Sequence, residues 1–169
     1  MIYYTSDLHF GHKNILKYEP RPWADIEQMD QGLIERWNSK VQNEDTVFIL
    51  GDLTFYKDER KNIELVSQLK GHKHLIIGNH DYYVKEKYLN KYFESIQHYK
   101  RIQDQGREVI LFHYPIFNWD KQQFGSYHLY GHVHSQQELQ LRIPNAFNAG
   151  VDVNNWYPVT LDELLKKKE

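Results

Sequence analysis

Short runs of apolar and β-branched residues recur along the chain, and each run ends in a polar, glycine-containing segment. The first three runs cover residues 2–5, 46–50 and 74–77 and are typical of short buried strands. Between these runs, residues 25–41 and 59–70 place apolar side chains at helical spacing. This alternation predicts parallel strands that are joined by right-handed crossovers.

Residues 82–91 predict a further helix, and the pattern then changes. Residues 95–103 and 107–112 are rich in β-forming side chains, and they flank a turn at Asp104-Gln105-Gly106. Two strands separated by such a turn predict a β-hairpin, which needs no crossover helix. The second part of the chain is therefore expected to contain antiparallel pairing.

The last part of the chain continues with short predicted strands and closes with a helix. The strands cover residues 127–130, 139–143 and 146–151. Thr160 and Glu163 have the spacing of a capping box, which marks the start of a terminal helix. Since no linker-like segment divides the chain, we expect one domain over residues 1–169, with a mixed sheet or two stacked sheets and helices outside.

The composition excludes several classes of protein. The 169 residues carry a formal net charge of −2, which argues against binding to extended duplex DNA, because such binding needs many lysine and arginine contacts. No apolar run approaches the roughly 20 residues that a membrane-spanning helix needs. The chain has no cysteine, which fits a cytoplasmic protein and excludes thiolate metal sites. Its ten histidines and 23 acidic residues allow metal sites built from nitrogen and oxygen ligands.

Residues that can bind metal directly follow five of the predicted strands. They are Asp7 and His9, Asp52, Asn79 and His80, His113, and His132 and His134. In open α/β sheets, ligands bind outside the carboxyl ends of the strands, so we expect these segments to converge on one rim. About eight donors of this kind can hold two divalent cations roughly 3.5–4 Å apart, with a carboxylate between them.

The same residues fall into motifs that resemble a known family. The motifs occur in the order Asp7-x-His9, Gly51-Asp52, Gly78-Asn79-His80-Asp81, His113 and Gly131-His132-x-His134. In this order they resemble the calcineurin-like metallophosphoesterases, and most closely the small, uncapped bacterial and phage members. The resemblance implies an α/β fold, a four-layer α/β/β/α sandwich of two mixed sheets flanked by helices.

The resemblance also implies a dinuclear centre, with Mn favoured over Fe, Zn, Ni or Co. One divalent ion would be held by Asp7, His9 and His134, and the other by Asn79, His113 and His132, while Asp52 would bridge the two ions. His80 would not be a ligand. It would stabilise the charge of the phosphate and protonate the leaving oxygen, with a metal-bound hydroxide as the nucleophile.

One departure from the family narrows the activity. Protein serine/threonine phosphatases of this family carry an Asp-Arg pair shortly after the Gly-Asp motif, whereas here Gly51-Asp52 is followed by Leu53-Thr54-Phe55-Tyr56. A protein phosphatase is therefore disfavoured. We expect a metal-dependent phosphoesterase that hydrolyses phosphodiesters in preference to phosphomonoesters, with a small phosphoester, a nucleotide or a nucleic-acid end as the substrate.

Each candidate residue also has a simpler explanation when it is taken alone. Asp7 and Asp52 could be loop or cap residues, Asn79 a turn residue and His113 a buried packing residue. The remaining histidines are expected to be surface or packing residues: His72, His74, His98 and His128. Only the full constellation favours metal binding.

Two further residues are candidates for contact with the substrate. His12 could touch the substrate phosphate or a carboxylate behind the metal ligands, and the alternative is a solvated loop histidine. Asp81 could contact the substrate or orient His80, but a cap on the following helix is slightly favoured.

Two other functions remain open at this point. The chain could be a non-catalytic metal-binding scaffold with the same fold, or a mononuclear metal-binding protein. His80 and the complete set of candidate ligands argue against a scaffold, because a scaffold has no need of a general acid.

Overall fold

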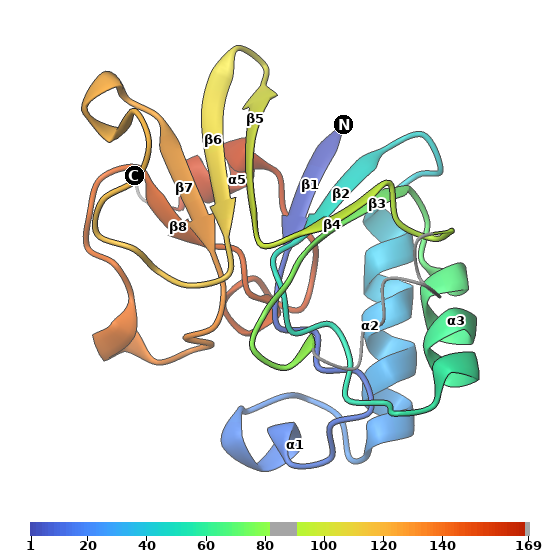
Figure 1. Cartoon of the computed structure of the whole chain (residues 1–169). Helices are drawn as coiled ribbons and strands as arrows, with labels where there is room; N and C mark the ends of the chain where they lie inside the picture. Colours follow the sequence, from blue (N-terminus) through green and yellow to red (C-terminus); the bar gives the residue numbers. More distant parts are fainter. Residues whose placement is uncertain (82–90, 168–169) are drawn as a thin grey trace.

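The structure is a computed structural model that describes residues 1–81 and 91–167. In these residues, strands form two four-stranded sheets that lie against each other, as Figure 1 shows. The first sheet has the order β1 (Ile2–Thr5), β2 (Thr46–Ile49), β3 (His72–Ile76) and β4 (Ser95–Gln97). The second sheet has the order β5 (Tyr99–Asp104), β6 (Arg107–Phe112), β7 (Tyr127–Tyr130) and β8 (Ala146–Asn148).

The helices of the described residues are mostly short. The α-helices are α1 (Ile15–Tyr18), α2 (Ile26–Lys40), α3 (Glu59–Gln68) and α5 (Leu161–Lys166). The short 3₁₀ helices are η2 (Gln122–Phe124), η3 (Gln137–Leu139) and η4 (Val151–Val153). Asp25 caps α2 by accepting a hydrogen bond from the Gln28 N–H, and Thr160 and Glu163 form the predicted capping box of α5. None of the helices within residues 1–81 and 91–167 combines the length and the apolar character that a membrane span requires.

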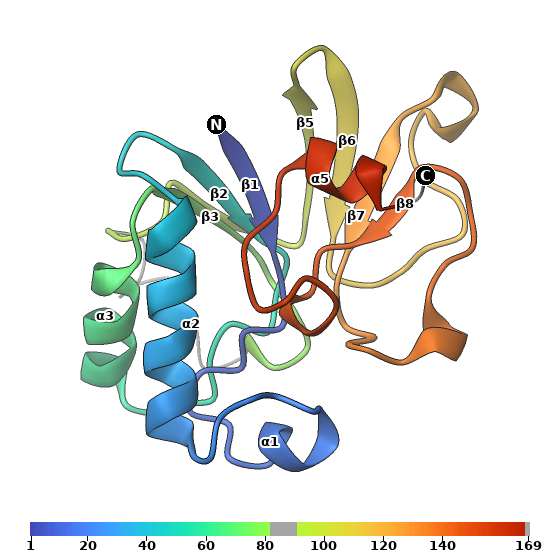
Figure 2. The same cartoon turned by 180° about the vertical axis from the view of Figure 1, so that it is seen from behind.

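Apolar side chains fill three layers of core. The first layer lies between the first sheet and helices α2 and α3, with Trp37 and Val66 among its fully buried residues (Figure 1). The second lies between the two sheets and also receives Leu161 and Leu164 of α5, which lies beside β1 (Figure 2). The third covers the outer face of the second sheet and includes Trp119 from a loop. The predicted arrangement of two sheets flanked by helices is confirmed.

The pairing of the strands differs in detail from the expectation of two mixed sheets. Within the first sheet, β1 to β4 all pair in parallel. Only the second sheet is mixed, because β5 is antiparallel to β6 whereas β6, β7 and β8 are parallel to one another. The predicted hairpin is β5–β6, with its turn at Gln105 and Gly106 in the left-handed region.

Three predicted elements are corrected by the structure. Residues 95–103 form two strands in different sheets, because the chain leaves the first sheet after β4 and enters the second as β5. Residues 139–143 are not a strand, since the Leu141 N–H donates to the Tyr130 hydroxyl instead of to a neighbouring strand. The predicted strand over 146–151 ends at Asn148. The predicted helix over 82–91 falls on residues 82–90, which lie outside the described part of the chain.

The carboxyl ends of the parallel strands meet where the two sheets join. Ser6, after β1, pairs with Gly150, after β8, through an isolated parallel bridge. The Gly131 N–H, after β7, donates to the carbonyl oxygen of His113, after β6, at 2.9 Å. The loops that carry the candidate ligands therefore form one rim across both sheets.

Candidate metal centre

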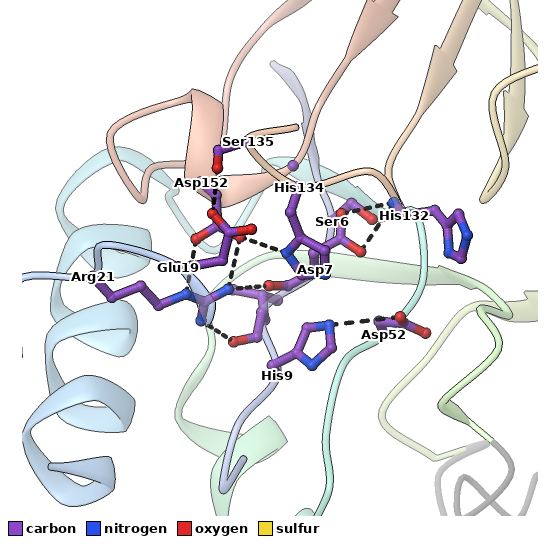
Figure 3. Close-up of polar contacts among 12 residues, drawn as sticks. Ser6, Asp7, His9, Glu19, Arg21, Asp52, His132, His134, Ser135 and Asp152 are labelled. Carbon is purple, nitrogen blue, oxygen red and sulfur yellow. Dashed lines mark hydrogen bonds and ion pairs between the residues drawn. The ribbon is translucent and has the colours of Figure 1, made fainter. Parts of the chain in front are cut away.

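The rim gathers the candidate ligands into two groups of three. Figure 3 shows the first group together with Asp52 and His132 of the second. In each group, the three ligand atoms lie within 4.8 Å of one another. The first group is Asp7, His9 and His134, and the second is Asp52, His113 and His132. The first group has the same members as the first expected set. In the second group, Asp52 stands with His113 and His132 in place of Asn79.

Asn79 lies at the second group. Its Oδ1 is 3.0 Å from Nε2 of His113 and 2.8 Å from Nδ1 of His132. Three nitrogen and oxygen atoms that converge at hydrogen-bond distance can also share a cation, since an amide oxygen and imidazole nitrogens are suitable metal donors.

Asp52 lies between the two groups. Its Oδ2 is 3.5 Å from Nε2 of His9 in the first group and 3.6 Å from Nε2 of His113 in the second. One carboxylate therefore faces candidate ligands of both groups, which is the position that a bridging ligand requires.

The backbone of the candidate ligands is strained. Five of the seven have φ between 45° and 70°, in the left-handed region that non-glycine residues rarely adopt. They are Asp7, His9, Asp52, His132 and His134. Each such residue costs of order 1–3 kcal/mol and persists only where the surrounding structure imposes it, which is typical of functional sites.

Two glycines let the loops approach the carboxylates closely. A Cβ atom on Gly78 would clash with the carboxylate of Asp52, and one on Gly131 would clash with Ser6 Oγ and with the carboxylate of Asp7. The Gly-Asn and Gly-His sequences after β3 and β7 therefore serve a close approach and not only a turn.

Burial sets the charge of the centre. It raises the pKa of Asp7 to about 6 and lowers that of His9 to about 4. Burial also acts to raise the pKa of Asp52, but the neighbouring His9 and His113 imidazoles lower it to about 2. Near neutral pH, the centre thus combines ionised carboxylates with an uncharged imidazole at His9, which suits binding of a cation.

One ring orientation is fixed by the backbone. His113 is fully buried, and its Nδ1 lies 2.6 Å from the carbonyl oxygen of Leu50. Because a carbonyl oxygen only accepts, Nδ1 carries the proton and Nε2 keeps its lone pair facing Asn79 and Asp52.

A divalent metal fits these residues. Nε2 of His9 is buried, yet it makes no hydrogen bond to any residue that the structure describes. A buried nitrogen without a hydrogen bond is costly, and a cation shared with Asp7 and His134 would satisfy it. The donors are carboxylate oxygens, an amide oxygen and imidazole nitrogens, a set that suits Mn, Fe, Zn, Ni or Co.

His80 lies at the edge of the candidate centre and belongs to neither group of three. Its ring contacts those of His9 and Phe55, with centroids 5.7 Å and 4.7 Å apart. Its backbone N–H donates to Oδ1 of Asp52 at 2.9 Å. Within residues 1–81 and 91–167, no carboxylate pairs with its imidazole.

Asp81 connects two loops of the rim through its carboxylate. Its carboxylate is buried and accepts hydrogen bonds from the N–H groups of Asp52, Leu53 and Gly78, at 2.7–2.8 Å. These bonds join the loops after β2 and β3 and engage both carboxylate oxygens, and none of the hydrogen bonds of the described residues links Asp81 to the His80 ring.

His12 lies beside the candidate ligands. Its Nδ1 is 3.0 Å from Nδ1 of His9, and its ring stacks on Phe55 with centroids 3.7 Å apart. Burial lowers the pKa of His12. The residue is therefore held in place and is not a freely solvated loop histidine.

No local sequence pattern points to the residues that surround His134. Arg21 and Asp152 form a buried ion pair beside it, although they are 131 positions apart (Figure 3). A pairing over such a distance leaves no local pattern in a single sequence.

Comparison with known proteins agrees with this geometry. The family model of the calcineurin-like phosphoesterases matches residues 1–167. The chain belongs to the calcineurin-like phosphoesterase family. Membership of this family supports hydrolase activity with bound divalent metal ions.

Related sequences include proteins of archaea and phages. This calcineurin-like phosphoesterase is 34% identical over 170 residues to the uncharacterized protein MJ1445 of Methanocaldococcus jannaschii, covering 98% of this chain and 89% of that protein. It is 32% identical over 179 residues to the gene 66 protein of Mycobacterium phage L5, covering 89% of this chain and 86% of that protein.

Solved structures share the fold. The protein of unknown function AQ665 from Aquifex aeolicus has a TM-score of 0.79 and 27% identity, covering 99% of this phosphoesterase and 98% of that chain. The nuclease MPE of Pseudomonas putida has a TM-score of 0.52 and 18% identity, covering 79% of this chain and 61% of that chain. The second likeness concerns the fold alone.

Proposed function

We propose that this phosphoesterase holds two divalent ions, Mn in preference to Fe, Zn, Ni or Co, and hydrolyses phosphodiesters in preference to phosphomonoesters. The observation that carries the proposal is the position of Asp52, whose Oδ2 faces His9 at 3.5 Å and His113 at 3.6 Å. Asp7, His9 and His134 would hold one ion, and Asn79, His113 and His132 the other. When bound, the two ions supply Lewis acidity, which neutralises phosphoryl charge and lowers the pKa of water.

His80 supplies the proton in this proposal. Its half-buried ring lies against His9 and Phe55 at the edge of the two groups, where the leaving oxygen of an ester can reach it. Protonation of that oxygen removes the charge that develops as the phosphorus–oxygen bond breaks. The hydrogen bond from the His80 N–H to Asp52 ties its position to the bridging carboxylate.

His12 is proposed to contact the substrate phosphate. Its Nδ1 is engaged with His9, and stacking on Phe55 fixes the plane of the ring. A neutral imidazole whose Nδ1 accepts a hydrogen bond carries its proton on Nε2, so His12 can donate to a phosphate oxygen.

The preference for diesters follows from the use of Arg21. A phosphomonoester brings a second negative charge, which a cation beside the two metal ions would help to neutralise. Arg21 contacts the loop of the candidate ligands, but its guanidinium is buried and engaged with Asp152 and with the carbonyl oxygens of Asp7 and Leu8. It cannot also bind the substrate, and the remaining site suits the single charge of a diester.

The partner that we propose is a small phosphoester, such as a nucleotide or a nucleic-acid end, in the cytoplasm. The net charge of −2 argues against extended duplex DNA, and the absence of cysteine fits a reducing compartment. No membrane association is proposed.

Hydrolysis of bis-p-nitrophenyl phosphate and p-nitrophenyl phosphate, with added Mn²⁺, tests the proposal. We expect turnover of the diester to exceed that of the monoester. Substitution His80→Ala should lower the rate by about 10²- to 10⁴-fold and leave the bound metal unchanged. The exposed His98 provides the control, since His98→Ala should alter neither. No turnover of either ester by a protein with two bound ions would favour the non-catalytic scaffold.

A further inference from the structure

A buried chain of hydrogen bonds stands behind His134. Its Nδ1 lies 2.7 Å from Oδ2 of Asp152, and Arg21 donates to both oxygens of that carboxylate, at 2.8 Å from Nε and 3.0 Å from Nη2 (Figure 3). The side chains of Arg21 and Asp152 are 0% and 2% exposed. A two-point guanidinium–carboxylate pair of this kind fixes the orientation of both groups.

The same guanidinium also holds the loop of the first two candidate ligands. Arg21 donates from Nη2 to the carbonyl oxygen of Asp7 at 2.7 Å, and from Nη1 to that of Leu8 at 2.8 Å. Arg21 therefore connects the loop that carries Asp7 and His9 with the carboxylate that contacts His134. All three members of the first group depend on this one side chain.

The segment that carries Arg21 is itself well fixed. Pro20 and Pro22 flank it and restrict its backbone. Beside it, the Ser135 hydroxyl donates to Glu19 at 2.5 Å, which joins this segment to the loop of His134 a second time. The contacts connect residues that are more than 100 positions apart in the sequence.

The chain of contacts selects one form of His134. A carboxylate that is paired with arginine is ionised and only accepts, so the His134 proton lies on Nδ1, facing Asp152. Nε2 of His134 then keeps its lone pair, as a metal ligand must.

A third metal site is the alternative reading of these residues, since ligand atoms of Glu19, His134 and Asp152 lie within 4.8 Å of one another. The positive guanidinium of Arg21 already occupies both oxygens of Asp152, and Ser135 donates to Glu19. Both carboxylates therefore have hydrogen-bond partners without an ion.

We propose that Asp152, held by Arg21, is a positioning residue for His134 and sets the metal affinity of the first group alone. This inference rests on the proposed dinuclear function. Groups that orient a metal-binding histidine typically change metal affinity by about 10- to 100-fold when they are removed. The second group contacts neither Arg21 nor Asp152 among the hydrogen bonds and ion pairs of the described residues, so its affinity should not change.

Titration of the metal-free protein with Mn²⁺ or Co²⁺, followed by calorimetry and by Co²⁺ absorption, tests the inference. The wild-type protein should bind two ions. Substitution Asp152→Asn should weaken one binding step by about 10- to 100-fold and leave the other unchanged. Asp120→Asn is the matched control, because it removes an exposed carboxylate paired with Arg101.

The double variant Asp152→Asn/His134→Ala shows whether Asp152 acts through His134. We expect it to bind metal no more weakly than His134→Ala alone. Equal weakening of both steps, an unchanged affinity, or a further loss in the double variant would overturn the inference. If Asp152→Asn does not fold, Arg21→Lys serves as the test. Lysine would contact Asp152 through one nitrogen only, so this variant should weaken the same binding step and leave the other unchanged. Wild-type protein that binds fewer than two ions would instead contradict the proposed function.

Discussion

The backbone N–H of His132 donates to both carboxylate oxygens of Asp7, at 3.1 Å and 3.0 Å, although the two residues are 125 positions apart. Asp7 follows a strand of the first sheet and His132 a strand of the second. The contact therefore joins the two sheets at the rim. The carboxylate that is a candidate metal ligand also holds together the loops that form the centre.

The buried charge of Asp7 lowers the free energy of unfolding of the metal-free protein near neutral pH. Burial raises its pKa to about 6, above its usual value of 3.8, so the folded state binds the proton more tightly than the unfolded state. The free energy of unfolding should therefore fall as pH rises from about 4 to 6. Asp7→Asn keeps an acceptor for the His132 N–H and removes the buried charge.

We expect metal-free Asp7→Asn to be more stable than the wild type at pH 7.5, by up to about 3 kcal/mol, with the difference vanishing towards pH 4. Urea unfolding in EDTA measures this difference. The variant should at the same time lose tight binding at the first metal position. A lower stability of the variant at pH 7.5 would show that the buried charge has no such cost.

Metal binding should stabilise the fold strongly. A cation offsets the buried charges of Asp7 and Asp52, and it binds the His9 nitrogen that lacks a hydrogen bond. Mn²⁺ at about 100 times its Kd contributes about 2.7 kcal/mol per site, and each kcal/mol raises Tm by roughly 2–4 °C in a protein of this size. We expect a rise of at least about 10 °C over the EDTA-treated protein, measured by thermal unfolding. The same addition to Asp52→Ala should give little or no rise. A rise that is equal in both proteins would place the stabilising ion elsewhere.

His128 provides a pH-dependent prediction outside the centre. It is fully buried on β7, its Nδ1 lies 3.3 Å from the Ile110 carbonyl oxygen, and burial lowers its pKa to about 4. A histidine that must stay neutral in the folded state stabilises it above pH 6.5, and this contribution is lost as pH falls from 6.5 towards 4.

In the wild type, the free energy of unfolding lost through His128 as pH falls should reach about 3 kcal/mol. Measured in EDTA, the difference in unfolding free energy between the wild type and His128→Gln should therefore shrink as pH falls through this range. The exposed control His98→Gln should show a difference that does not depend on pH. A penalty for His128→Gln that stays constant from pH 7 to pH 4 would contradict the prediction.

Asp81 should matter for stability. Its buried carboxylate accepts from three backbone N–H groups, and an unpaired buried donor costs about 1–3 kcal/mol. We expect Asp81→Ala to lower the free energy of unfolding by at least about 2 kcal/mol. Asp58→Ala is the matched control, because the exposed Asp58 accepts from a single N–H at the start of α3 and should cost about 1 kcal/mol. Equal losses in urea unfolding would refute the role as a connector of two loops.

Hydrophobic patterning predicts β1 and β2 well, because these strands are continuous apolar runs, as in residues 46–50. Patterning does not say to which sheet a strand belongs. The run at 95–103 therefore predicts one strand, whereas the chain crosses from β4 to β5 between the sheets. The run at 139–143 has apolar residues that pack on the outer face of the second sheet without strand pairing.

The candidate site was predictable where a residue that can bind metal directly follows a predicted strand. Asp7 and His132 each follow an apolar run, and the rule that ligands lie at the carboxyl ends of strands brings them to one rim. The residues that hold these candidate ligands in place were not predictable in this way. The pairing of Arg21 with Asp152 depends on three-dimensional proximity, and neither residue lies in a recognisable motif.

In the proposed centre, the rim holds two cations that share Asp52. The most direct measurement is an anomalous difference map, recorded at the Mn absorption edge from crystals grown with Mn²⁺. We predict two peaks roughly 3.5–4 Å apart, one beside Asp7 and His9 and the other beside Asn79 and His113, with Asp52 between them. A single peak, or peaks away from these side chains, would contradict the binding of two cations that share Asp52.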